Sequence, residues 1–518
     1  MCTEQGSGVG IVVLTSALCG VLLLVSFVHR ISEVAYSIYL IGALLLLYHV
    51  LYQRENIEWR RSQGLIALVL IIIVYYLRVG HSYYTSWDDF TYWGPAINTV
   101  IANKGIAANQ ETMTVLSPFY HYPMLTSVFN CFMAKVMGFT EGNMLFASGL
   151  LSILFLGVLL VENSPMKTVV TVTSVLAVCT LYNTALRSLY PDSTLGIIFG
   201  VTLSIYIQVK NKVNALLCIG PLLFVLPQIK VVGFWLAYAG VGIILIDMVM
   251  RWRSVYSTKL VFVFMLIATI PAVSQGMWYN HIKFDGAVIN QPSYGLGLEM
   301  LWAHLSPEAR SQEDMERLSG FLQSVAKFSY TEGTVLTYVL VIFSVFLVIK
   351  YRKEDLVECV RLYCILFVFF VLYLCFRCSL YFSHFSYEEA VSGASGARYY
   401  STFFTAFSVV AATYIRRVLI QVDSKELRRC TILSAILFVS IISYRIYSRP
   451  YKELSEERKY VKYIASKLIA GGVEQKDIDY TRISPYGCNV LRYELYPHLE
   501  LMQEEYSKCA ELVQLQMS

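Results

Sequence analysis

Charged residues are scarce in this chain of 518 residues. Asp, Glu, Lys and Arg make up 15% of it, against roughly 25% in an average soluble domain. Hydrophobic residues make up 56%, and the mean hydropathy is +0.56. The net charge of +5 is small for this length, and the basic residues lie in short clusters between apolar runs. The composition therefore indicates a membrane protein and gives no sign of nucleic-acid binding.

The chain also lacks a framework of paired cysteines. Its twelve Cys are scattered, mostly within apolar segments, unlike the regular spacings of a disulfide scaffold. Cys375 and Cys378 form a CxxC in "VLYLCFRCSLYF", but no second pair or βαβ unit accompanies it, so we interpret both as packing residues. Cys488 and Cys509 lie in a polar tail and could form a disulfide if that tail faces an oxidising space.

Apolar runs of bilayer length dominate the sequence, and we count about thirteen of them. They predict transmembrane helices, because they are too long and continuous for barrel strands. The first has no basic residues before it and no small-residue cleavage pattern after it, so we expect a retained helix rather than a signal peptide. The runs are 8–29, 34–53, 64–80, 143–161, 168–186, 193–209, 213–228, 231–250, 259–276, 333–350, 362–382, 399–420 and 431–447. We therefore predict an all-α polytopic membrane protein.

One shorter apolar run, 122–139, decides the topology. It carries Asn130 and Lys135. If it lies along the outer interface, every major basic cluster falls on the cytoplasmic side, as the positive-inside rule requires; if it spans, the last four clusters face outward. We therefore predict an interfacial segment and a cytoplasmic N-terminus. The clusters are Arg54, Arg60 and Arg61; Lys167; Lys210 and Lys212; Arg251, Arg253 and Lys259; Lys350, Arg352, Lys353 and Arg361; and Arg416, Arg417, Lys425, Arg428 and Arg429.

This topology divides the chain into two domains. Residues 1–447 form a transmembrane region with large outer loops at 81–142 and 277–332, and residues 448–518 form a small extracytoplasmic domain. The expected location is a cell membrane crossed many times, with the functional site and the C-terminus outside the cytoplasm. No internal repeat is visible, which argues against an inverted-repeat transporter.

An acid pair, Asp88 and Asp89, stands among aromatic residues in "SWDDFTYWG". A solvated loop rim beside an interfacial aromatic belt would also explain it. The same face, however, gathers isolated cations at the ends of apolar helices, with acidic and amide side chains beside them. Ionisable residues at such depth are candidates for function, although a snorkelling side chain is the ordinary alternative. The cations are Lys230, Arg187, Arg377 and Arg398, and their neighbours are Asp192 and Gln228.

The order of these motifs resembles the polytopic GT-C glycosyltransferases, which include protein O-mannosyltransferases and the lipid A aminoarabinose transferase. Asp88-Asp89 corresponds to the acid pair in that family's first outer loop. "HYPML", residues 121–125, corresponds to its Tyr-Pro-Pro-Leu-like step, and Lys230 with Gly233 and Arg398-Tyr399 to its later motifs. The chain departs from the family pattern by its second Asp, by Met124 in place of a Pro, and by an additional early helix.

The resemblance implies a GT-C-type bundle that transfers a sugar from a polyprenyl-phosphate carrier to an acceptor, with inversion. Asp88 would be the general base and Asp89 would orient it, bind the acceptor or hold a divalent cation such as Mg or Mn; no cofactor is certain. The phosphate ligands would be Lys230, Arg187, Arg377 and Arg398. The sugar or acceptor site would be lined by Tyr92, Trp93, His121, Tyr122, Asp192 and Tyr399, and the loop 277–332 would cover it.

The implied partners are the lipid-linked donor, a glycan, lipid or protein acceptor, and membrane lipids. Two other functions remain open from the sequence. A Wzy-like polysaccharide polymerase or O-antigen ligase usually carries its functional loop late, whereas the chemically rich loop here is early. A transporter or flippase would place ionisable residues near the bilayer midplane, where this sequence has few. The oligomeric state also remains open.

Overall fold

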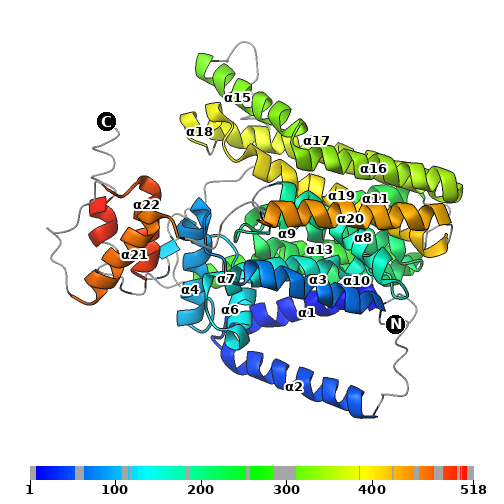
Figure 1. Ribbon diagram of the computed structural model, residues 1–518. Helices are drawn as coiled ribbons and strands as arrows, with labels where there is room; N and C mark the ends of the chain where they lie inside the picture. The colour runs from blue at the N-terminus through cyan, green and yellow to red at the C-terminus, as the bar shows by residue number, and fades with distance from the viewer. Residues whose placement is uncertain are drawn as a thin grey trace.

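The structure is a computed structural model, and the described residues form helices joined by turns and short segments, with no strand (Figure 1). Those residues are 7–52, 63–107, 112, 115–116, 119–182, 186–251, 257–284, 311–383, 385–422, 425–447, 454–471, 482–496, 498, 502 and 504–509. The predicted all-α class is thus confirmed for the part of the chain that is described.

Every predicted apolar run coincides with a helix. These helices are α1 (Ser7–Ser26), α2 (Ile31–Tyr52), α3 (Gln63–Val79), α7 (Glu141–Phe155) continued by the 3-10 helix η3 (Leu156–Leu159), α8 (Pro165–Leu181), α9 (Asp192–Gln208), α10 (Lys212–Ile229), α11 (Val231–Met250), α13 (Thr258–Phe284), α16 (Glu332–Tyr351), α17 (Leu356–Ser383), α19 (Gly396–Gln421) and α20 (Lys425–Tyr447). Among the described residues, nine helices are long and apolar enough to cross a membrane. The chain is therefore a multi-pass membrane protein.

The nine are fewer than the predicted crossings because several apolar helices are short. Helices α3, α8 and α9 have 17 residues each, which at about 1.5 Å per residue is slightly less than the ~30 Å hydrocarbon thickness. In α2, Ile31–Leu45 counts among the shorter apolar helices. Helix α6 (Leu125–Met137) has only 13 residues. It is too short to cross, which agrees with the prediction that the run 122–139 does not span.

Helices α9 and α19 form the centre of the bundle. Nearly all of α9 is buried, and it packs closely along α19. Gly196 and Gly200 permit this approach, because a Cβ at Gly196 would collide with the carbonyl oxygen of Thr402 and one at Gly200 with Ala406 and Val409. Small residues four apart are a common way to bring transmembrane helices together. The contact aligns the N-terminal ends of both helices, where Asp192 and Arg398 lie.

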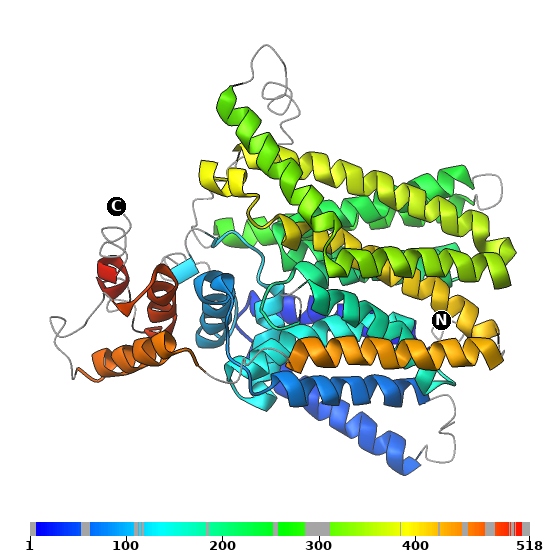
Figure 2. The ribbon, with the colours of Figure 1, turned by 45° about the horizontal axis from the view of Figure 1, so that its top comes forward.

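Short helices cover that end of the bundle. The π-helix η2 (Asp89–Trp93) continues into α4 (Gly94–Ala102), and α4 lies across the ends of the bundle helices (Figure 1). Helices α15 (Gln312–Ser329) and α18 (Tyr387–Ser392) project beyond the bundle at the same end (Figure 2). The predicted loop 277–332 is therefore helical at both ends, because α13 continues to Phe284; residues 285–310 lie outside the described residues.

The C-terminal region contributes α21 (Glu456–Ile469) and α22 (Pro485–Glu494), which lie beyond α4 (Figures 1 and 2). Cys488 of α22 forms a disulfide with Cys509, the pairing that the polar tail allowed. Cys375 and Cys378 are free cysteines on α17; Cys378 is buried, in line with a packing role, whereas Cys375 is exposed.

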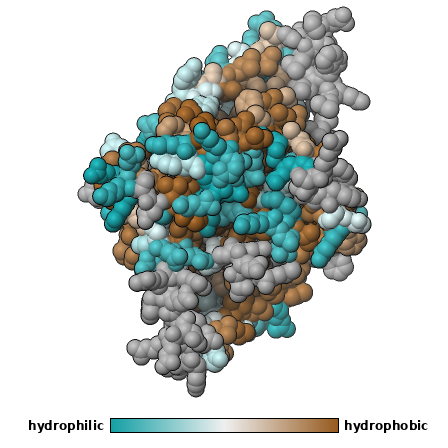
Figure 3. All heavy atoms as spheres, turned by 90° about the vertical axis from the view of Figure 1, so that its right-hand side faces the viewer, coloured by the Kyte–Doolittle hydropathy of each residue, from teal (hydrophilic) through white to brown (hydrophobic). Residues whose placement is uncertain are grey.

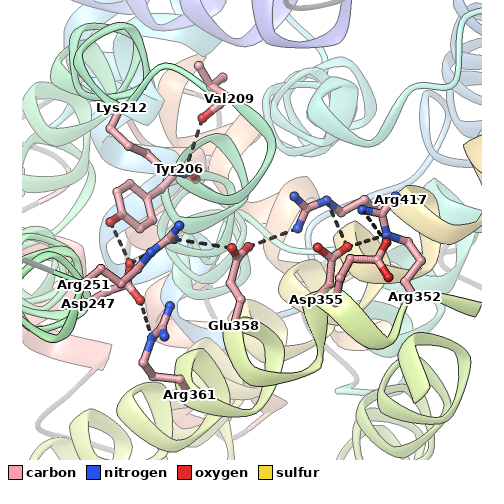
Figure 4. Close-up of polar contacts among 11 residues, drawn as sticks. Tyr206, Val209, Lys212, Asp247, Arg251, Arg352, Asp355, Glu358, Arg361 and Arg417 are labelled. Atoms are coloured by element: carbon pink, nitrogen blue, oxygen red, sulfur yellow. Dashed lines mark hydrogen bonds and ion pairs between the residues drawn. The ribbon is translucent and has the colours of Figure 1, made fainter. Parts of the chain in front are cut away.

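Basic clusters meet at the opposite end of the bundle, where hydrophilic residues occupy the middle of the face (Figure 3). The fully buried Asp247 of α11 accepts hydrogen bonds from Tyr206 (2.7 Å) and Arg361 (2.6 Å), and Glu358 of α17 pairs with Arg417 at 3.0 Å (Figure 4). These pairs join α9, α11, α17 and α19. Members of four predicted basic clusters thus share one end: Lys212, Arg251, Arg361 and Arg417. Arg54, Arg60, Arg61 and Arg253 lie outside the described residues. That this end faces the cytoplasm stays a prediction.

Candidate functional site

A cavity of about 580 Å³ opens at the end of the bundle covered by η2 and α4. Its walls come from the first large outer loop, from the segment before α9, from the α10–α11 junction, and from α17, α18 and α19. The lining residues are Trp87, Asp88, Tyr92, Trp93, Phe119, Tyr122, Tyr190, Lys230, Arg377, Leu380, Phe385, Glu389, Ser395, Arg398 and Tyr399. Most of the predicted site residues are therefore brought together around one space.

Asp88 lies at this cavity in an ion pair with Arg398. An oxygen of its carboxylate is 2.6 Å from Nη1 of Arg398, and its side chain remains 30% exposed. The backbone N–H of Asp88 donates to the Tyr190 hydroxyl at 3.4 Å, and the Arg398 guanidinium stacks 4.5 Å above the Tyr190 ring. Asp88 is therefore a carboxylate that solvent or a ligand can reach, held beside a cation.

Asp89 has a different environment, although it is adjacent in sequence. It is fully buried, and its carboxylate accepts backbone N–H groups from Leu189 at 2.8 Å and Ser86 at 3.1 Å. Adjacent residues on a helix point in directions about 100° apart, so one acid faces the cavity while the other ties the loop 83–90 to the segment before α9. Burial raises the pKa of Asp89 from 3.8 to about 7.

This pKa predicts a stability that depends on pH. Because the folded-state pKa exceeds the ordinary value, the protonated form contributes stability that is lost as pH rises from about 4 to about 7, with a slope of up to roughly 1.4 kcal/mol per pH unit. Thermal unfolding in nanodiscs across this range should show the decline, and Asp89→Asn should flatten it. Glu388→Gln, at an exposed position of α18, serves as the control; an unchanged slope in Asp89→Asn would contradict the assignment.

Lys230 occupies a break between α10 and α11, where its backbone is extended. Gly233 makes the break possible, because a Cβ there would collide with the carbonyl oxygen of Leu226. The buried ammonium lies 2.9 Å from Asp192 and 5.0 Å from the centre of the Tyr399 ring. The Lys-x-x-Gly spacing noted in the sequence thus reflects a tight turn that aims a cation at the cavity.

Arg377 supplies a third cation, buried near the C-terminal end of α17. Its guanidinium stacks 3.6 Å from the centre of the Tyr399 ring. Nε and Nη2 of Arg377 are buried and have no hydrogen-bond partner among the described residues. A buried donor without a partner costs about 1–3 kcal/mol, more when it is charged. Arg377 is therefore suited to an anionic ligand that enters the cavity.

The formal charges around the cavity balance. Three cations, Lys230, Arg377 and Arg398, face three carboxylates, Asp88, Asp192 and Glu389. Asp192 lies between Lys230 and Arg398, with the Arg398 Nε at 3.7 Å, and Glu389 is exposed. Among the described residues Arg377 has no carboxylate paired with it, and in a partly buried site such a cation attracts an anion more strongly than it would in water.

An apolar groove of about 240 Å³ lies next to the cation cluster, between α11 and α17. Tyr373 joins the two spaces, because it lines the groove and its hydroxyl donates to the Tyr399 carbonyl at 3.3 Å. The groove is lined by Trp235, Leu236, Tyr238, Ala239, Phe369, Leu372, Tyr373, Phe376 and Phe403. An apolar chain attached to an anionic group could occupy both spaces at once.

Aromatic rings form the opposite wall. The Tyr92 hydroxyl donates to the Tyr122 carbonyl at 2.9 Å, and Trp93 packs edge-on against Tyr92, with ring centres 4.7 Å apart. Trp87 also lines the cavity and is 46% exposed. Such rings can stack on the apolar face of a sugar while leaving its hydroxyls free.

Some predicted site residues lie outside the cavity lining. Asp192 is paired with the Lys230 ammonium, which lines the cavity. The His121 carbonyl accepts a hydrogen bond from Trp278 at 2.9 Å. Arg187 lies toward α3, close enough for its charge to act on the Tyr75 hydroxyl. The cavity also includes Tyr190 and Glu389, which the sequence reasoning did not select. Tyr190 precedes the selected Asp192 by two residues, and Glu389 lies in the outer segment just before Arg398.

Among the described residues, no group of three or more His, Cys, Asp or Glu side chains could hold a metal ion. Asp88 lines the cavity, whereas the Asp89 carboxylate is buried against backbone N–H groups. Comparisons of the chain with models of protein families, with curated proteins and with solved structures find no match.

Proposed function

We propose that this protein is a membrane glycosyltransferase of GT-C type with about thirteen crossings, which moves a sugar from a polyprenyl-phosphate donor to an acceptor on the outer face of a cell membrane. The proposal rests on the environment of Arg377. It is a buried cation whose Nε and Nη2 lack partners among the described residues, and it lines the same cavity as Lys230, Arg398 and the accessible Asp88.

The donor phosphate would bind at the buried cations Arg377 and Lys230. Arg377 offers a planar set of N–H donors that matches phosphate oxygens, and Lys230 adds a point charge. In the transition state the bond between the sugar and the phosphate oxygen breaks, and negative charge builds up on the phosphate. Cations already fixed in the cavity stabilise this charge without rearranging.

Asp88 would take the proton from the attacking hydroxyl of the acceptor. The hydroxyl oxygen forms the new bond to the anomeric carbon from the face opposite the phosphate, which gives inversion. Asp88 is paired with Arg398 at 2.6 Å. A bound phosphate would compete for Arg398 and leave Asp88 free for the acceptor hydroxyl.

The apolar groove between α11 and α17 supports a donor carried on a lipid. It adjoins the cation cluster through Tyr373, as a prenyl chain attached to a phosphate would require. A water-soluble nucleotide sugar would have no use for this groove. A prenyl chain in this groove would bring the sugar to the cavity from within the membrane.

Direct assay of transfer tests the proposal. With a membrane extract supplying the acceptor, we expect purified protein in nanodiscs to move the sugar from polyprenyl-phosphate sugar to that acceptor and to release polyprenyl phosphate. We also expect cells lacking the protein to miss one glycan modification by mass spectrometry. Uptake of the lipid-linked sugar across vesicles without any transfer would instead identify a flippase, and repeated addition of oligosaccharide units from a lipid diphosphate would identify a polymerase.

A further inference from the structure

The C-terminal domain packs against the side of residues 83–93 that faces away from the cavity. Helix α22 contacts η2, and both α21 and α22 lie next to this region in Figures 1 and 2. Residues 83–93 carry Asp88. The C-terminal domain is therefore placed to fix the orientation of Asp88, the proposed base.

Arg458 of α21 makes the central contact. Its side chain is almost completely buried and pairs with Glu141 at the start of α7 and with Glu494 of α22, the latter at 3.4 Å. Its Nη1 donates to the Tyr84 carbonyl at 2.8 Å, and Glu141 in turn accepts the Tyr84 N–H at 2.7 Å. Both backbone groups of Tyr84 are thus fixed by one ion pair.

The same guanidinium contacts the other side of the acid pair. It lies 4.8 Å from the centre of the Phe90 ring, so that Arg458 touches the chain both before and after Asp88. A lysine could not make these contacts together, because its ammonium is a single point charge without a planar fork.

A layer of aromatic rings completes the contact. Tyr493 of α22 packs against Tyr84 and Phe90, with ring centres 5.7 Å and 5.4 Å apart. Tyr486 packs against Phe90 at 5.5 Å and against Trp87 at 6.3 Å. The Cys488–Cys509 disulfide holds α22 to the end of the chain. This layer backs a segment whose opposite side forms the cavity wall.

We propose that Arg458 is a positioning residue, which acts through Tyr84 and Phe90 to hold Asp88 toward the cavity, and that the C-terminal domain is consequently part of the catalytic unit. The inference rests on the proposed function for its kinetic consequence only. The predicted fixing of residues 83–93 follows from the contacts themselves.

Hydrogen exchange and kinetics on the full-length protein in nanodiscs test this role together. In Arg458→Ala we expect amide exchange within residues 83–93 to accelerate at least tenfold while the bundle helices keep wild-type rates. We expect kcat to fall about 100-fold, as for a reacting group displaced by about 1 Å, with little change in the donor KM, because Lys230 and Arg377 are untouched. The exchange rate and the kcat of Arg458→Lys should lie between those of the wild type and those of Arg458→Ala.

Lys459→Ala, on an exposed position of the same helix, is the matched control and should behave like wild type. Unchanged exchange in residues 83–93, or acceleration spread equally over the bundle helices, would overturn the proposal. If Arg458→Ala does not fold, Tyr493→Leu, which removes a ring contact without removing a charge, provides the same comparison. If the wild type transfers no sugar, the proposed function fails while the exchange data still decide the role of Arg458.

Discussion

Asp88→Asn is expected to lower the rate of sugar transfer by a factor on the order of 10²–10⁴, the usual contribution of a general base. An amide of the same shape cannot take the proton from the acceptor hydroxyl. The loss should appear in kcat, because the donor phosphate is bound by other residues. Stability should change little, since the Asp88 side chain is 30% exposed and partly exposed ion pairs contribute about 1 kcal/mol or less.

Two further variants separate this effect from a general loss of charge at the outer end. Glu388→Gln removes an exposed carboxylate of α18 and should leave transfer unchanged. Asp88→Glu keeps the base but moves it by one methylene, so that activity should fall less than in Asp88→Asn. Full transfer by Asp88→Asn, measured as release of polyprenyl phosphate, would remove Asp88 from the mechanism.

Much of the fold could be predicted because a bilayer imposes strong local constraints. A long apolar run must be a helix in lipid, and the runs found in the sequence coincide with helices α1 to α3, α7 to α11, α13, α16, α17, α19 and α20. Helix ends were less predictable. Nothing in the apolar pattern shows that α13 continues to Phe284, because a polar stretch can extend a helix beyond the membrane.

In the candidate site, the sequence singled out residues whose charge stands out against apolar surroundings. Lys230 and Arg377 were selected in this way, because ionisable residues in apolar segments are candidates for function. Asp89 was selected as half of an acid pair, but nothing local shows that it is buried, and Arg458 was not selected. The role of Asp89 depends on the backbone N–H of Leu189, 100 residues away, and that of Arg458 on the Tyr84 carbonyl, 374 residues away. Such partners are set by tertiary packing.

Lys230→Met is expected to have the largest combined effect on stability and transfer. The side chains of Lys230 and Asp192 are 7% and 3% exposed and lie 2.9 Å apart, and removing one partner of a buried pair costs about 3–5 kcal/mol because the other charge is left behind. Arg398, at 3.7 Å from Asp192, should reduce this cost. Transfer should be lost as well, because the phosphate loses a cation.

The double variant Lys230→Met with Asp192→Asn separates these two losses. It removes both charges, and replacing a complete buried pair is often close to neutral for stability, so the unfolding midpoint should return toward wild type. Transfer should not recover, because the cation that faces the donor is still missing. Lys230→Arg, which keeps the charge, is the control and should retain part of the stability and part of the sugar transfer. If transfer recovered together with stability in the double variant, Lys230 would be an internal ion-pair partner of Asp192 and not a phosphate ligand, and the phosphate site would then consist of Arg377 and Arg398 alone.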